Sequence, residues 1–142
     1  MNDENTKRII DACPSLFVTM DEDTGVILPI RFGFECGDGW ADLLVELCDK
    51  IQARLNILDK DVAKEIVALQ VKEKYGTLRF YLSHYDELME LCIQEAEKKS
   101  ACTCEQCGKP GKIRGNYWYY VACDEHTQEM DLDKPSSESE LS

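Results

Sequence analysis

The chain lacks a long apolar run and is short of basic residues. No stretch of its 142 residues is apolar for the length that a membrane-spanning helix needs, and residues 1–5 are polar. We therefore expect no signal peptide and no membrane anchor, and a location in the reducing cytoplasm. Lysine and arginine number 16 against 28 aspartates and glutamates, a formal net charge of −12. This charge opposes general binding to nucleic acid or to anionic membranes.

A catalytic set is also missing around the glycine-rich segment 33–40. Glu35, Asp38 and Asp42 place carboxylates there, but no histidine or serine nearby completes an acid–base or nucleophilic site. We interpret the segment as a shaped loop that opens a helix, with Asp38 or Gly39 as the helix cap.

Four residues near the C-terminal end have the spacing of metal ligands. They are Cys104, Cys107, Cys123 and His126. Two short ligand pairs, separated by fifteen residues, can supply the tetrahedron that zinc prefers and leave no coordination position open. The sequence therefore predicts one structural Zn²⁺ ion. Cys102 is a rival for the first ligand, because the Cys-Thr-Cys sequence at 102–104 permits a shift of register.

A disulfide framework is the alternative interpretation of the eight cysteines, and the expected reducing environment argues against it. Cys36, Cys48 and Cys92 lie in apolar surroundings or on expected helices. A free cysteine in such a place usually acts as a small hydrophobic residue.

The residues between the two ligand pairs predict a small zinc unit. Gly108 follows the second cysteine and can take the left-handed conformation of a zinc knuckle. Residues 112–122 contain two short extended runs around a Gly-Asn turn, and a short helix is expected from Asp124 to about Met130. Knuckle, hairpin and helix in this order predict a treble-clef-like unit, with a zinc ribbon as the near alternative.

The rest of the chain predicts a small α+β domain. Apolar residues recur every three or four positions over 40–55 and 86–99, which indicates two main helices. Residues 66–71 and 78–82 have strand character and predict an antiparallel hairpin. Shorter elements are expected before them, a helix over 6–13 and extended segments over 16–18 and 26–28.

The charge is unevenly distributed over three expected regions. The core domain, residues 1–100, carries 12 basic and 20 acidic side chains, whereas residues 101–126 carry three of each. We expect a zinc-binding unit over 101–130 that packs on the core. Residues 131–142 are acidic and free of aromatics, which predicts a disordered tail.

Basic and aromatic residues alternate in two places outside the ligands. The candidate binding residues are Lys72, Lys74, Tyr75 and Arg79 in the first hairpin, and Lys112, Arg114 and Trp118 in the zinc unit. This combination can bind single-stranded nucleic acid. In so acidic a chain, the same cations can instead pair with carboxylates while alternate aromatics fill the core.

Taken together, three segments resemble a family of small phage and prophage proteins of unassigned function. They are residues 33–40, residues 71–81, and the two cysteine-containing ligand pairs. Thr77 departs from the second glycine expected in the hairpin, and the acidic tail is additional. The resemblance implies a phage context, a location in the host cytoplasm and a C-terminal zinc motif, but brings no activity.

Three functions are compatible with these features. The first is an interaction protein that modulates a host or defence protein complex, its acidic surface occupying a groove that binds nucleic acid. The second is a nucleic-acid-binding accessory factor that acts through the zinc hairpin. The third is a zinc-dependent hydrolase with Glu105 or Glu125 as base, which requires an open coordination position. We expect a binding protein rather than an enzyme.

Overall fold

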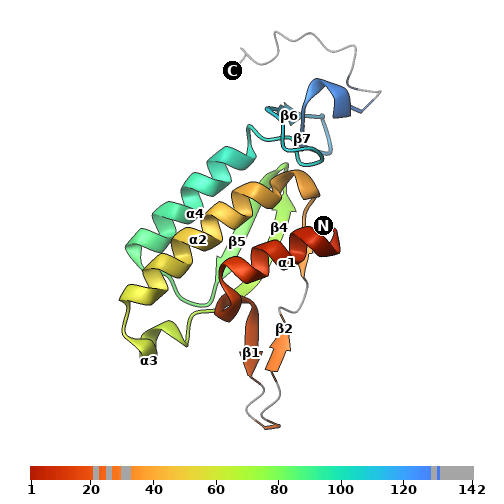
Figure 1. Ribbon diagram of the computed structural model, residues 1–142. Coiled ribbons are helices and arrows are strands. Elements are labelled where there is room, and N and C mark those ends of the chain that lie inside the picture. The colour runs from red at the N-terminus through yellow and green to blue at the C-terminus, as the bar shows by residue number, and fades with distance from the viewer. Residues whose placement is uncertain (21–22, 25–26, 30–32, 129–130, 132–142) are drawn as a thin grey trace.

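The computed structural model describes residues 1–20, 23–24, 27–29, 33–128 and 131. Within these residues the chain has a mixed α+β fold with three small sheets (Figure 1). None of the described helices is both long and apolar enough to span a membrane. Residues 132–142, most of the expected tail, lie outside the described part of the chain.

Four α-helices are described. They are α1 (Asp3–Ala12), α2 (Ala41–Ile57), α3 (Lys60–Ala63) and α4 (Glu87–Ser100). The two main helices match the expected positions to within two residues. The first helix begins earlier than the predicted residue 6, because the Asn2 side chain caps it by accepting a hydrogen bond from the Asn5 N–H.

The main sheet has three strands in the order β3 (Phe34–Glu35), β4 (Ala68–Lys74) and β5 (Thr77–Leu82). The predicted antiparallel hairpin is confirmed as β4 and β5. The short strand β3, which the sequence pattern did not indicate, pairs with β4 in parallel.

Two further hairpins complete the described structure. The strands β1 (Val18–Met20) and β2 (Ile27–Pro29) pair antiparallel, as do β6 (Lys112–Arg114) and β7 (Tyr120–Ala122). Leu16 and Phe17, expected to be extended, lie instead in a 3-10 helix that begins at Pro14. Proline is well suited to the first turn of such a helix, and both residues bury their side chains.

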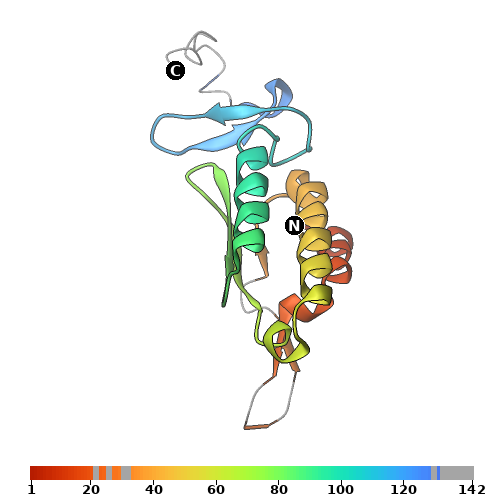
Figure 2. The same ribbon diagram turned by 90° about the vertical axis from the view of Figure 1, so that its left-hand side faces the viewer.

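The helices cover one face of the main sheet (Figure 2). Alternation along β5 buries Leu78, Phe80 and Leu82 against the helices, so Thr77, Arg79 and Tyr81 lie on the opposite face. The helix α2 contributes its apolar stripe, which includes the fully buried Leu44, to the same core, and the fully buried Trp40 precedes it at the N-cap. The opposite face of the sheet therefore carries polar and aromatic side chains.

Candidate metal centre

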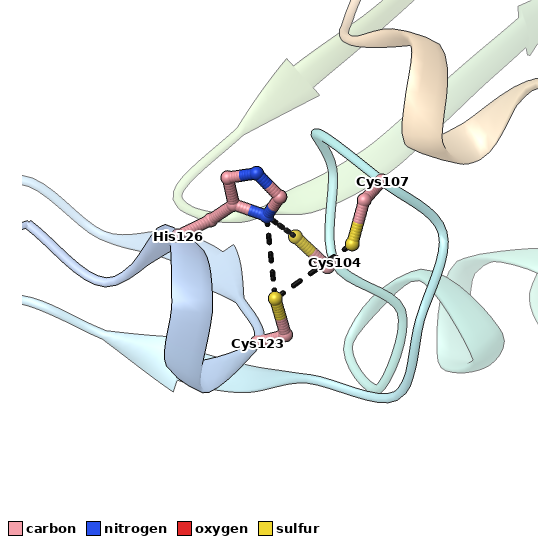
Figure 3. A group of neighbouring side chains, drawn as sticks. All are labelled: Cys104, Cys107, Cys123 and His126. Atoms are coloured by element: carbon pink, nitrogen blue, oxygen red, sulfur yellow. Dashed lines mark hydrogen bonds between the residues drawn. The ribbon is translucent and has the colours of Figure 1, made fainter.

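Cys104, Cys107, Cys123 and His126 converge, with one ligand atom from each lying within 4.8 Å of the others (Figure 3). The Nδ1 atom of His126 lies 3.6 Å from Sγ of Cys104 and 3.2 Å from Sγ of Cys123. The sulfurs of Cys107 and Cys123 are 3.7 Å apart. The cluster predicted from the spacing is therefore present and could hold a metal ion.

These distances fit a tetrahedral metal site and exclude a disulfide. A zinc–sulfur bond of about 2.3 Å places two sulfurs of a regular tetrahedron roughly 3.8 Å apart. Bonded sulfurs would be separated by only about 2.05 Å. All eight cysteines are free, and Cys102 is exposed and outside the cluster, which corrects the alternative register for the first ligand.

The first ligand pair lies on a tight backbone turn. Gly108 has a φ of +82°, the predicted left-handed conformation, and its N–H donates a hydrogen bond of 2.9 Å to the carbonyl of Cys104. The N–H of Cys104 donates in turn to the carbonyl of Lys109 at 2.8 Å. This double link closes the loop and brings the two sulfurs of the pair to the same side.

The second ligand pair follows β7. A 3-10 helix, Asp124–His126, turns the chain so that His126 faces Cys123. The helix expected to reach about Met130 ends at His126, since Thr127 and Gln128 are not helical. The last two residues of the expected helix, 129 and 130, lie outside the described residues. Asp131, the first residue of the expected tail, is buried and accepts a hydrogen bond from the Tyr120 hydroxyl.

Hydrogen bonds from backbone amides favour the thiolate form of Cys104, which is the form that binds a cation. Burial raises the pKa of Cys104, but hydrogen bonds from the backbone at Cys123, Cys107 and Gln106 outweigh it and lower that pKa to about 6. The backbone at Lys109 lowers the pKa of Cys107, but desolvation and the neighbouring sulfurs raise it more, so the net shift is upward. Thiolates this close repel one another, and a bound cation relieves that repulsion.

The other buried cysteines have the opposite electrostatics. Burial raises the pKa of Cys13 to about 11 and that of Cys36 to about 12, and it raises the pKa of Cys48 well above the usual value. These thiols remain protonated at neutral pH and act as core side chains, as expected for Cys36 and Cys48.

The glycine-rich loop attaches the metal cluster to the core. The Gly39 N–H donates to the carbonyl of Glu105 at 2.7 Å, and the Gly37 N–H donates to the Glu105 carboxylate at 2.8 Å. The indole N–H of Trp40 donates to the carbonyl of Thr103 at 2.9 Å. Sequence reasoning missed this role, because a glycine that faces a carbonyl distant in the sequence has no local signal.

The carboxylates near this loop also have structural partners. Asp38 was expected to be a possible cap of α2, but its side chain accepts hydrogen bonds from the Asn2 backbone and the Asn5 side chain and so holds α1. The N-cap residue of α2 is Trp40 rather than Asp38 or Gly39, and no side-chain hydrogen bond caps the helix there. Asp42 pairs with Arg8 at 2.7 Å, and Glu35 accepts from Gln70.

Parts of the two basic and aromatic segments line one groove. Lys74 and Tyr75, at the end of the β4–β5 hairpin, line a groove together with Tyr117, Trp118 and Tyr119 from the loop between β6 and β7. The structure therefore brings three of the predicted binding residues, Lys74, Tyr75 and Trp118, into one place.

The remaining predicted binding residues are distributed differently. Lys72 and Arg79 are opposite one another on β4 and β5, below the groove. Arg114 is largely covered, pairs with Asp124 at 2.9 Å and donates to the carbonyl of Ala122. Lys112 lies with Arg114 beside a separate hollow.

No protein-family model, curated protein or solved structure matches this chain. The candidate site is therefore defined by its own geometry: a four-ligand cluster, its attachment to the core and the adjoining aromatic groove.

Proposed function

We propose that the cluster binds one zinc ion with a structural role, in a treble-clef-like unit. The ligand set of three cysteines and one histidine, together with the tetrahedral spacing, supports zinc over harder cations, which prefer oxygen ligands. The knuckle followed by the β6–β7 hairpin supports the treble-clef comparison, although the terminal helix is only three residues long.

The protein itself is proposed to be a binding protein rather than an enzyme. The observation that carries this proposal is the full set of four ligands, since catalytic zinc needs an open position for water or substrate. The two candidate bases also have other partners. Glu105 accepts a hydrogen bond from Gly37, and Glu125 forms an ion pair of 3.3 Å with Lys109.

We further propose that the acidic helical side binds a protein. The helices α1, α2 and α4 carry ten acidic and six basic side chains, whereas β3, β4 and β5 carry two acidic and three basic ones. An acidic surface suits a partner with a basic groove for nucleic acid. In the phage context, the partner would be a host or defence complex.

A capture experiment tests the partner class. Tagged protein is incubated with a bacterial lysate, with and without nuclease, and bound proteins are identified by mass spectrometry. We expect a stoichiometric protein that survives nuclease and elutes with rising salt, because exposed charges are screened.

Single-charge variants locate the binding face. Asp49→Asn on α2 and Glu90→Gln on α4 should each weaken capture, whereas Glu35→Gln on β3 serves as the matched control. Equal capture by all three variants would contradict a role for the helical side. Capture that disappears with nuclease would show that nucleic acid, and not a protein groove, mediates it.

A further inference from the structure

A groove of about 320 Å³ forms where two turns meet. The loop between β6 and β7 extends over the end of the β4–β5 hairpin (Figure 2). The contact is close at Gly76, whose φ is +91° and where an added Cβ would lie 3.3 Å from the backbone nitrogen of Tyr120. The metal-binding unit therefore fixes one wall of the groove and the main sheet fixes the other.

Exposed aromatic rings form the walls. The relative exposure is 70% for Tyr75, 100% for Tyr117 and 76% for Trp118. Tyr75 also has a φ of +55°, in a two-residue turn. Asparagine and glycine adopt this left-handed conformation at a lower energetic cost than tyrosine. A tyrosine kept in this position at a conformational cost, with its ring in solvent, is better explained by a ligand than by packing.

The cations beside the groove differ from most others in this protein. Eight of the basic side chains that the structure describes form an ion pair with a carboxylate. Lys72, Lys74 and Arg79 form none with any described residue. Two nearby carboxylates have other hydrogen-bond donors, since Glu73 accepts from the Gly76 N–H at 2.7 Å and Glu35 accepts from Gln70. A third carboxylate, Glu97, lies close enough to Arg79 to interact with it electrostatically without forming an ion pair.

These three cations lie on the face of the sheet that the helices leave uncovered. Lys72 is directly opposite Arg79 in the register, and Lys74 is opposite Thr77 at the groove. The Nζ atom of Lys74 lies 5.5 Å from the centre of the Tyr75 ring. Arg79 donates hydrogen bonds to the Thr77 hydroxyl at 2.7 Å and to the Leu78 carbonyl at 3.1 Å. A row of positively charged side chains thus leads up the sheet to the exposed rings.

We propose that this surface binds single-stranded nucleic acid. Bases stack on Tyr75 and Trp118, and successive phosphates lie against Lys74, Lys72 and Arg79. A duplex is disfavoured because its bases are already stacked and cannot present their faces to the rings. The acidic remainder of the chain repels other approaches and confines the strand to this face. The site is separate from the protein-binding helical side proposed above.

Fluorescence anisotropy of the zinc-loaded full chain tests the proposal. Labelled single strands of thymidine or uridine, about 12 nucleotides long, are compared with a duplex of equal length at about 50 mM salt. Single strands should bind. The logarithm of the association constant should fall linearly with the logarithm of the salt concentration, with a slope of about −2 for three phosphate contacts. Binding should also quench tryptophan fluorescence, because Trp118 is exposed whereas Trp40 is fully buried.

Matched variants separate the site from general charge effects. Trp118→Ala and Tyr75→Asn should each weaken binding at least fivefold while the protein stays folded, since asparagine suits the turn at position 75. Lys72→Gln should reduce the salt slope by about 0.7. Lys60→Gln removes the same charge from α3 and should leave the dissociation constant within about twofold.

Three outcomes would overturn the proposal. They are absence of single-strand binding by the folded, zinc-loaded protein, equal binding of single strand and duplex, and equal weakening by Lys72→Gln and Lys60→Gln. If oligonucleotides do not bind but Trp118→Ala abolishes the nuclease-resistant capture, the groove is a protein site. The nucleic-acid proposal then fails while the protein-binding function stands.

Discussion

Replacing Gly39 with alanine should detach the metal-binding unit from the core. The new Cβ would lie 2.1 Å from the carbonyl oxygen of Cys104 and 2.6 Å from the carbonyl carbon of Glu105. Both are backbone atoms and cannot rotate away, so the knuckle has to move by about 1 Å or more to reach ordinary van der Waals distance.

That movement breaks two connections. The Gly39–Glu105 and Trp40–Thr103 hydrogen bonds contribute about 0.5–1.5 kcal/mol each. Because Trp40 is fully buried, its unpaired indole N–H costs a further 1–3 kcal/mol or so. We expect a total loss of about 2–6 kcal/mol in the free energy of unfolding, a large share of the stability of a typical domain.

Urea unfolding followed by tryptophan fluorescence measures this loss, with zinc content determined in parallel. Bound zinc should remain, because all four ligands lie within the displaced unit. Gly33→Ala is the control: its φ of +63° makes alanine strained by about 1 kcal/mol, but no atom of the described residues lies within 4 Å of the new methyl. Equal losses in the two variants would refute the attachment role of the loop.

Three further predictions concern other parts of the chain. Asp86→Ala should cost about 1–2 kcal/mol at pH 7 through loss of the α4 N-cap. Burial alone would raise the pKa of Asp86. The hydrogen bond from the Met89 N–H in the first turn and the contact with Arg54 outweigh burial, so the net shift of the pKa is downward. The advantage of the wild type over the variant is thus present above the usual aspartate pKa of about 3.9, and it should shrink in urea titrations as the pH falls through and below that value. Trp118→Ala should change the melting temperature little, because the side chain is exposed; a marked drop would mean that it packs. Truncation after Asp131 should leave melting unchanged, whereas truncation before it should lower stability by about 1 kcal/mol through loss of the Tyr120 hydrogen bond; equal melting of both forms would contradict this.

The long elements of the fold were predictable because their signals are local. The apolar period of α2, the Asp86 cap of α4 and the alternation in β5 each lie within one segment. The two-residue strand β3 has no such signal, since its pairing with β4 joins positions far apart in the sequence. The early start of α1 depended on a cap at Asn2, which the apolar pattern did not include.

The metal ligands were predictable from spacing, but their surroundings were not. The approach of the glycine-rich loop to Glu105 depends on tertiary packing, and a glycine required by a distant carbonyl looks like any loop glycine. The groove likewise requires Tyr75 and Trp118 to meet from separate hairpins. Sequence alone also cannot tell which basic side chains form ion pairs with carboxylates. Arg114 pairs with Asp124, whereas Lys72 forms no ion pair with a described residue.

Metal content of purified protein tests the central claim most directly. Elemental analysis should find one zinc per chain in the wild type and in Cys102→Ser, which alters an exposed cysteine outside the cluster. Cys107→Ser should lose zinc and melt at a lower temperature, because metal binding is coupled to folding of the unit. Full zinc occupancy and unchanged melting in Cys107→Ser, or no zinc in the wild type, would contradict the structural zinc site.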